Sequence, residues 1–408
     1  MYHTPSIKSL LTIAAGAATL LCLQFGLTLT AVADADPAFS FYGYQQIVAN
    51  PSPAIANENT QITVTVANLG DAPATNVHVK LSYNDWGVTF QGWQEIDVVV
   101  IPSIPTGGTA AAEFDHVFTN RAHTCLEALI VSADQNADLN NDRGQINMEV
   151  VNAGESFAYG VPIVNNGEDD LVVQVRAECV RDDAAGAVVG RCRGIDELIR
   201  VPAGQEIFVP VQVEFFRDTP RGTPIDIVVK AFDVLSPDDV HAMNHVVVRV
   251  VYNTSRGLME DCLAALDALP LLPSPGKGKR SNGLAKKIDE IASHIDKALA
   301  SDAWVGDSRL ESHPRAIPLV YEQSAVAVQQ LLTLIESNDL PIEWKIELNQ
   351  CVRDLTDAAR ILLQTAIRDA GGNLEAELLL EEGDALRLAG DEKNAVRKYR
   401  TGHVSILK

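Results

Sequence analysis

The sequence predicts a β-rich first half, made of two antiparallel β-sandwiches in tandem, followed by an α-helical bundle. Three observations predict this fold class. Short runs of alternating apolar residues fill positions 40 to 252, and several landmark residues recur there at a constant spacing. After residue 253 the apolar period changes to that of a helix.

Residues 1–33 have the layout of a secretory signal peptide. Lys8 precedes the apolar stretch from Leu10 to Val32, which ends in small residues just before Asp34. A charged start, an apolar middle and a small-residue cleavage site are the features of such signals. The stretch is also long enough for a membrane-spanning helix, so an uncleaved anchor is the alternative. We expect a secreted, periplasmic or cell-surface protein.

The chain is strongly acidic. Its formal net charge is −22, and removal of Lys8 with the signal segment leaves −23. Between residues 34 and 150 the only basic residues are Lys80, Arg121 and Arg143. Nucleic acids and anionic membranes bind clustered Lys and Arg, so this composition argues against both as partners.

Residues 40–252 contain one strand pattern twice. Alternating apolar runs are separated by Gly, Pro, Asn and Asp, which is typical of antiparallel sandwiches. Five pairs of landmarks are each 97 residues apart: Asn68 and Asn165, Gly70 and Gly167, Pro105 and Pro202, Gly107 and Gly204, Asn147 and Asn244. The constant offset predicts two copies of one domain, residues 34–150 and 151–252.

Each landmark has a predicted physical role. The Asn-x-Gly stretches ANLGD and VNNGE supply residues that tolerate positive φ, which lets the chain reverse after a strand. Pro and Gly in IPTGGT and VPAGQE end one strand and turn into the next. Asn147 and Asn244 open the last strand of each copy, QINMEVV and MNHVVVRVV.

The first copy carries a family resemblance. Its stretches ITVTVANLGDAPATNVHVKL, IPTGGT and ALIVSADQN, then NND and a final strand, resemble the CARDB family, a bacterial domain associated with cell adhesion. The resemblance covers residues 45–150 and implies an immunoglobulin-like sandwich, an extracellular binding or spacer role, and no catalytic residues. We expect the second copy to be a further immunoglobulin-like sandwich.

The loop DQNADLNNDRG, residues 134–144, is a candidate calcium site. Alternate positions carry oxygen-bearing side chains that can surround a cation. They are Asp134, Asn136, Asp138, Asn140 and Asp142. The loop is not an EF-hand, because Leu139 and Gln145 replace the required Gly and Glu. A solvated turn between strands is the alternative, since the corresponding stretch 231–241 is also acidic. No other cofactor is expected.

Five cysteines follow the signal segment, so an exported protein keeps at least one thiol unpaired or linked to another chain. AECVRDDAAGAVVGRC predicts a hairpin that sets Cys179 opposite Cys192, within reach of a disulfide. Cys262 and Cys351 fall in predicted helices and are a second candidate pair, at a separation that the sequence does not define.

Residues 253–408 are predicted to form the helical bundle. They begin with the capping residues Asn253-Thr254-Ser255, and their apolar residues then fall three or four apart, which gives each helix one apolar face to bury. One helix starts near Pro341 and ends at Gly371-Gly372. The stretch PSPGKGKRSNG, residues 273–283, predicts a flexible connection after the first helix.

The final stretch, GDALRLAGDEKNAVRKY, resembles half of a tetratricopeptide repeat. The matching residues are Gly383, Leu386, Gly390, Ala395 and Tyr399. Gly402 departs from the family, which usually has Ala there. Peptide-binding grooves require stacked repeats, so the resemblance implies a helix-turn-helix packing and no function.

Aromatic residues cluster in YNDWGVTFQGW, residues 83–93. If exposed, Trp86 and Trp93 can stack on sugars or contact a partner protein. If buried, they belong to the sandwich core, which is the commoner place for aromatic side chains.

No catalytic constellation stands out. GRCRG, residues 190–194, fits a nucleophile-elbow string, but an all-β region lacks the strand-to-helix turn that this motif needs. His241 with His245, and His123 with Cys125, each supply two ligands where a metal site requires more. We therefore expect a protein that is not an enzyme.

These observations favour an exported adhesion, surface-assembly or scaffold protein that binds an extracellular protein through sandwich edges or loops. The alternative is a carbohydrate-binding accessory subunit of a secreted hydrolase or cell-wall complex.

Overall fold

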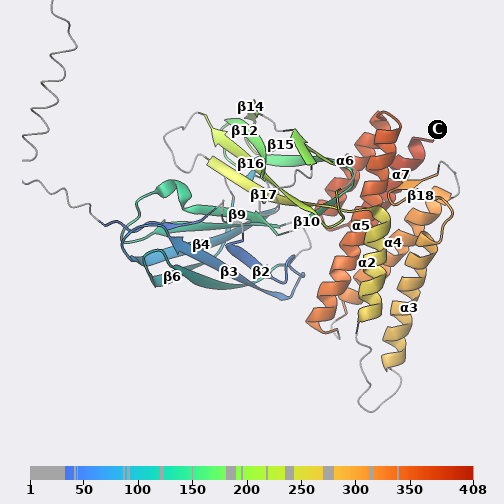
Figure 1. Cartoon of the computed structure of the whole chain (residues 1–408), viewed down its shortest axis with the longest axis horizontal. Helices are drawn as coiled ribbons and strands as arrows, with labels where there is room; N and C mark the ends of the chain where they lie inside the picture. Colours follow the sequence, from blue (N-terminus) through green and yellow to red (C-terminus); the bar gives the residue numbers. More distant parts are fainter. Residues whose placement is uncertain are drawn as a thin grey trace, which may run out of the picture.

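The computed structural model describes residues 33–407 except 41–42, 44, 86–87, 90–91, 120–123, 149, 181–189, 194–195, 217–218, 235–242, 270–279, 312–315 and 338–339. The predicted signal peptide, apart from Ala33, lies outside these residues. A β-rich region with several sheets is followed by a helical region with six helices in the described chain (Figure 1). None of the described helices has the length and apolar character needed to cross a membrane.

The first unit, residues 34–148, has two antiparallel sheets around one core. One sheet contains β1 (Pro37–Ala38), β2 (Ile47–Asn50), β3 (Asn59–Asn68) and β7 (Thr109–Val117). The other has the order β6 (Gln94–Ile104), β4 (Ala74–Asp85), β8 (Thr124–Ser132) and β9 (Arg143–Asn147). Alternate side chains of β3 and β4 are buried between the sheets. The period of two in their sequences therefore gives each sheet one core face.

The second unit, residues 150–252, is also a pair of sheets. One sheet has the order β13 (Gly190–Arg193), β15 (Gln205–Phe215), β11 (Ser156–Asn165) and β5 (Val88–Thr89). The other has the order β10 (Val150–Ala153), β17 (Met243–Tyr252), β16 (Pro224–Asp233), β12 (Leu171–Val180) and β14 (Asp196–Val201). Their shared core is rich in valine, a β-branched residue that suits a pleated surface.

The first unit contributes a strand to the second. β5 follows β4 of the first unit in the chain but pairs with β11 of the second, and Val88 is fully buried in the second unit's core. The predicted closing strand QINMEVV is wrong for the first copy, because it is split. β9 stays in the first unit, whereas β10 pairs in parallel with β17, where Val151 and Ala153 become fully buried.

The repeat is visible in hydrogen bonds as well as in sequence. The side-chain amides of Asn68 and Asn165 are buried, and each donates to one carbonyl four residues on and to another 36 residues on. The acceptors are Ala72 and Ile104 for the first, and Asp169 and Val201 for the second. Each Asn therefore fastens its turn to the end of a distant strand.

The predicted backbone role of the Asn-x-Gly stretches needs correction. Positive φ occurs at Gly107 and Gly204, with φ of 64° and 66°, and not at Asn68 or Asn165. The glycines of IPTGGT and VPAGQE thus make the turns, as predicted, and the asparagines act through their side chains.

The helical region packs around one hydrophobic core. Its helices are α2 (Ser255–Ala268), α3 (Arg280–Leu299), α4 (Ala316–Ile335), α5 (Ile342–Asp369), α6 (Leu374–Leu388) and α7 (Glu392–Ser405), with a small hairpin of β18 (Trp304–Gly306) and β19 (Arg309–Leu310). Thr254 caps α2 by accepting a hydrogen bond from the amide of Gly257 at 3.1 Å. α5 starts after Pro341 and ends before Gly371 and Gly372, as predicted.

The predicted connection at 273–283 is too long. α3 already begins at Arg280, and residues 273–279 lie outside the described chain. Gly283 does not stop this helix, since a single glycine costs only about 1 kcal/mol relative to alanine.

The C-terminal pair α6 and α7 forms the helix-turn-helix that the half-repeat resemblance implied. Gly390 turns the chain with φ of 77°. A Cβ on Gly383 would stand 2.7 Å from Cδ1 of Tyr399, so this glycine permits the close approach of the two helices. Gly402 similarly faces Leu363 of α5, where a Cβ would lie 2.9 Å from a methyl group. That contact accounts for the departure from the usual Ala.

α5 joins the helical region to both β units (Figure 1). Lys345 near its start forms an ion pair with Glu58 of the first unit. The fully buried Arg360 pairs with Asp384 of α6 and donates to the carbonyl of Ala158 in the second unit at 3.1 Å. Charged side chains buried at such a junction require these partners, because an isolated buried charge is costly.

Candidate functional site

The strongest binding candidate is the outer edge of β6 in the first unit. Among the described strands, β6 pairs only with β4, so one side of this strand of eleven residues has no strand neighbour. Val98 and Val100 point to the exposed face with 37% and 45% of their surface accessible. Edge strands carry backbone amides and carbonyls that a second chain can pair with, and natural proteins normally protect them with charges, bulges or proline.

β6 is protected at its two ends, and within it the side chain of Asp97 accepts a hydrogen bond from the backbone amide of Val98 at 2.7 Å. Its register with β4 shifts at Ile96, and Pro102 removes one backbone donor. Between them, Asp97 to Ile101 continues in regular register with β4. The sequence does not predict this exposed surface, because a run of valines is typical of a buried strand. Only the position of β6 at the side of its sheet exposes Val98 and Val100.

The acidic loop does not gather its predicted calcium ligands. Asp134 accepts hydrogen bonds from Thr75 at 2.6 Å and Asn76 at 2.8 Å, so it is turned toward the start of β4. Asp142 is buried and accepts from Asn136 at 2.7 Å. In the described part of the chain, no three His, Cys, Asp or Glu side chains are placed to hold a metal ion.

The loop instead anchors the N-terminal segment. Asp36 accepts from the side chain of Asn141 at 3.3 Å and from the amide of Asp138 at 3.3 Å. Burial, with a smaller contribution from the nearby negative charges of Asp36 and Asp138, raises the pKa of Asp142 to about 6. The side chain of Asn140 lies outside the described residues. The loop contains a short helical turn, η2 (Leu139–Asn141), and its interactions are those of a structural turn.

The two predicted aromatic binding residues have different outcomes. Trp86 lies outside the described residues. Trp93 is half-buried and packs against the core of the second unit, next to the segment that carries β5. This placement favours the buried alternative for Trp93.

The predicted hairpin around Cys179 and Cys192 is wrong. Cys179 lies in β12 and pairs with Ile227, whereas Cys192 lies in β13 and pairs with Val213, in the opposite sheet. The turn between them, residues 181–189, and both cysteine side chains lie outside the described chain. The disulfide itself stays a prediction, and it would have to join two sheets and not two neighbouring strands.

Of the paired His and Cys residues, His123 and His241 lie outside the described residues. Cys125 and His245 are both buried, Cys125 in the core of the second unit and His245 within β17. GRCRG is divided between β13 and residues outside the described chain.

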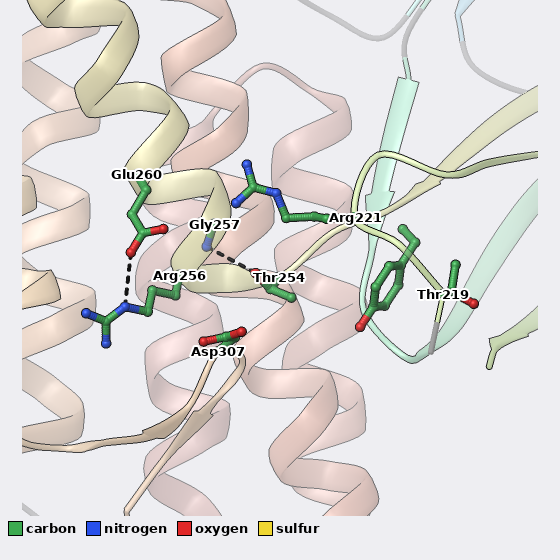
Figure 2. A pocket seen from close by; sticks show the side chains of 8 residues that line it. Thr219, Arg221, Thr254, Arg256, Gly257, Glu260 and Asp307 are labelled. Carbon is green, nitrogen blue, oxygen red and sulfur yellow. Dashed lines mark hydrogen bonds and ion pairs between the residues drawn. The ribbon is translucent and has the colours of Figure 1, made fainter. Parts of the chain in front are cut away.

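A polar cavity of about 310 Å³ opens where the second unit meets the start of α2 (Figure 2). Its cations are already matched by carboxylates, because Arg256 pairs with Glu260 at 3.1 Å and Arg221 pairs with Asp261. Asp307 adds a further negative charge. The helix N-terminus of α2 favours anions, but this acidic lining opposes them.

A second cavity, of about 420 Å³, lies between the first unit and the helical region. Its lining includes Glu58, Lys345, Asn349 and Arg353. Sequence reasoning missed both cavities, because each is assembled from segments that are far apart in the chain.

The fold and the β6 edge define a class: a multi-unit β-sandwich protein with a helical region. The CARDB family model matches residues 45–143, which confirms the predicted resemblance for the first unit. Domains of this family occur in extracellular and surface proteins. No curated protein matches the chain in sequence.

Solved structures give only distant likenesses. Trypsin-activated α-2-macroglobulin from Escherichia coli is 10% identical with a TM-score of 0.22, over 86% of this chain and 34% of that one. Red sea bream transglutaminase is 14% identical with a TM-score of 0.18, over 51% and 31%. The calcium binding domain CBD12 of CALX1.1 is 11% identical with a TM-score of 0.16, over 56% and 86%. The chain thus spans about a third of the first two proteins, and at these TM-scores no fold or activity is transferred from any of them.

Proposed function

We propose that this is an exported, non-enzymatic adhesion or scaffold protein that binds an extended segment of a partner protein along β6. The observation that carries the proposal is an edge strand of eleven residues with two exposed valines and an unbroken central stretch. In strand addition, backbone hydrogen bonds supply affinity and alternate side chains supply specificity.

The proposed partner segment is extended, apolar at alternate positions and basic. Val98 and Val100 would contact its apolar side chains on one face of the enlarged sheet. The exposed Glu95 and Asp97 at the start of β6, together with the net charge of −22, favour a basic partner through charge complementarity.

We also propose that both β units are immunoglobulin-like sandwiches. The matching side-chain bridges of Asn68 and Asn165, and the matching turns at Gly107 and Gly204, support a common plan. Export is supported by the signal-like residues 1–33 and by the CARDB match. An extracellular setting would give the β6 edge access to partners on other cells or surfaces.

The test compares two variants of the full chain in pull-downs from extracellular fractions of the producing cells. Val98→Lys with Val100→Lys places charges on the edge, which should weaken capture of a partner at least tenfold, or about 1.4 kcal/mol. Val326→Lys is the control, because Val326 is 38% exposed but lies in the helix α4 and not at a sheet edge. Equal capture by both variants would rule out β6 as the binding edge.

The carbohydrate-binding alternative has less support. It requires exposed aromatic rings, and Trp93 packs against the second unit. A glycan array with the full chain tests it directly. Binding that survives the double lysine substitution at Val98 and Val100 would favour carbohydrate over strand addition.

A further inference from the structure

We propose that Cys262 and Cys351 form a disulfide bond in the exported protein, which fastens α2 to α5 inside the helical region. The two residues are free thiols in the structure. Cys262 is 0% and Cys351 is 1% exposed, and the sulfur of Cys351 lies 3.5 Å from the carbonyl oxygen of Cys262. The Cys351 thiol donates to that carbonyl, so the two cysteines lie next to each other where α2 packs on α5.

The packing of α2 on α5 creates this contact. α2 lies against α5 (Figure 1), and the core that they share contains Cys262 and Leu266 of α2 and Cys351 and Leu355 of α5. Helices pack with axes about 8–10 Å apart when the side chains between them are small, and cysteine is small enough for such a crossing. Disulfides need Cα atoms within about 7 Å, and the 3.5 Å contact between the Cys351 sulfur and the backbone carbonyl of Cys262 brings the two residues close together.

The bond forms by thiol–disulfide exchange. Two thiols lose two protons and two electrons, and the electrons reduce a disulfide of a protein oxidase or of glutathione to two thiols. The inference therefore rests on the proposed export into an oxidising compartment, where such acceptors occur. It does not depend on binding at β6.

The surroundings of the two thiols determine the stage of folding at which the bond forms. Burial raises the pKa of the Cys262 thiol well above its usual range, and the hydrogen bond to Cys351 and the charges of Asp354 and Asp261 raise it further. The thiolate is the attacking species, so the folded reduced protein reacts slowly. The bond must form during folding, before α2 is packed.

The consequence is a covalent closure of the helical region. The link spans 89 residues of chain and includes α3 and α4. α2 begins three residues after the end of β17, so holding α2 also holds the second unit against α5. Long closed loops are those in which a crosslink restricts the unfolded chain most.

Peptide mapping of the full-length exported protein tests the proposal. The protein is alkylated in denaturant without reductant and then digested. We expect a crosslinked peptide pair that contains Cys262 and Cys351. Alkylation of both thiols, or a link from either one to Cys125, Cys179 or Cys192, would overturn the proposal. The wild-type chain is used, so the result does not require a variant to fold.

Refolding separates this inference from the question of export. Reduced chain refolded in a glutathione redox buffer should acquire the bond, and protein that was already folded should acquire it at least about tenfold more slowly. The oxidised protein should melt about 5 °C higher than the reduced protein. In a background that carries Cys179→Ala and Cys192→Ala, which removes the other predicted disulfide, Cys351→Ala should remove that difference, whereas Cys125→Ala should keep it. A melting difference that persists in Cys351→Ala would contradict the assignment.

Discussion

At the scale of single residues, Asp142 is a buried carboxylate in a loop with metal-like spacing. Its carboxylate lies in a buried position, and the protein supplies one hydrogen bond from Asn136 and two negative neighbours, Asp36 and Asp138. Two amide oxygens of the loop, Asn136 Oδ1 and Asn141 Oδ1, are buried without a hydrogen-bond partner in the described chain. The site therefore contains more acceptors than donors, which disfavours a charged carboxylate.

Asp142→Asn should stabilise the protein at neutral and alkaline pH. The pKa of Asp142 rises from 3.8 to about 6 on folding, so the folded state binds more protons between these values. Stability therefore falls as pH rises through this window, and the cost remains above it. We expect a gain of about 1 to 2 kcal/mol at pH 8 and a smaller gain at pH 4.5, measured by urea unfolding. A loss of stability at pH 8 would show that the ionised form is preferred.

The same variant tests the calcium prediction. If the loop is a structural turn, millimolar calcium leaves the melting temperature of the wild type unchanged. A rise with calcium in the wild type that Asp142→Asn abolishes would instead show that the loop holds the ion.

At the scale of elements, the packing of α6 against α7 depends on Gly383, although glycine is a poor helix former. Gly383 lies in α6 against the ring of Tyr399, and the hydroxyl of Tyr399 donates to Asp384 at 2.8 Å. The buried ring is held at both ends, by this hydrogen bond and by the core, and has little room to move. A methyl group at position 383 would therefore push the two helices apart.

Gly383→Ala should destabilise the protein by at least about 2 kcal/mol, because overpacking outweighs the gain of about 1 kcal/mol in helix propensity. Gly283→Ala is the matched control. That glycine is also helical, in α3, but nothing lies within 4 Å of its Cβ position. Thermal melting should show a lower Tm for the first variant and an equal or higher Tm for the second. Similar Tm shifts in the two variants would contradict the explanation that Gly383 is required by packing.

Most elements follow from local sequence. The period of two in β3, the cap at Thr254 and the stop at Gly371-Gly372 each act within a few residues, so the sequence predicts them. The failures depend on distant partners. The strand QINMEVV splits because β17 and the second core attract its second half, and the cysteine hairpin opens because β12 and β13 join different sheets. The exposure of the β6 valines likewise depends on the order of strands in the sheet, which the local sequence does not define.

At the scale of the whole molecule, buried polar contacts on α5 couple the helical region to the second unit. Asp357 accepts from the side chain of Asn152 at 3.0 Å and pairs with Arg387 at 3.0 Å. One turn further, Arg360 makes a two-point ion pair with Asp384, with both contacts at 2.7 Å. The packing of these groups predicts that the second unit and the helices unfold together.

Arg360→Met should cost about 3 to 5 kcal/mol, because it removes the charged partner of Asp384 and one of the donors to the carbonyl of Ala158. Calorimetry should then show two separate transitions in place of one. Arg200→Met is the control, since its ion pair with Asp170 is exposed and its loss should change stability by no more than about 0.5 kcal/mol. A single unshifted transition in Arg360→Met would contradict the proposed coupling.

The pairing of β5 with the second unit has a consequence for how such a protein can evolve. Many extracellular repeats are inherited as separate domains that recombination can copy, delete or reorder. Here β5 of the first unit pairs with β11 of the second, so separating the two units would remove a strand from the second unit's sheet. The two β units are therefore expected to be inherited together, with sequence changes on the two sides of their interface selected together.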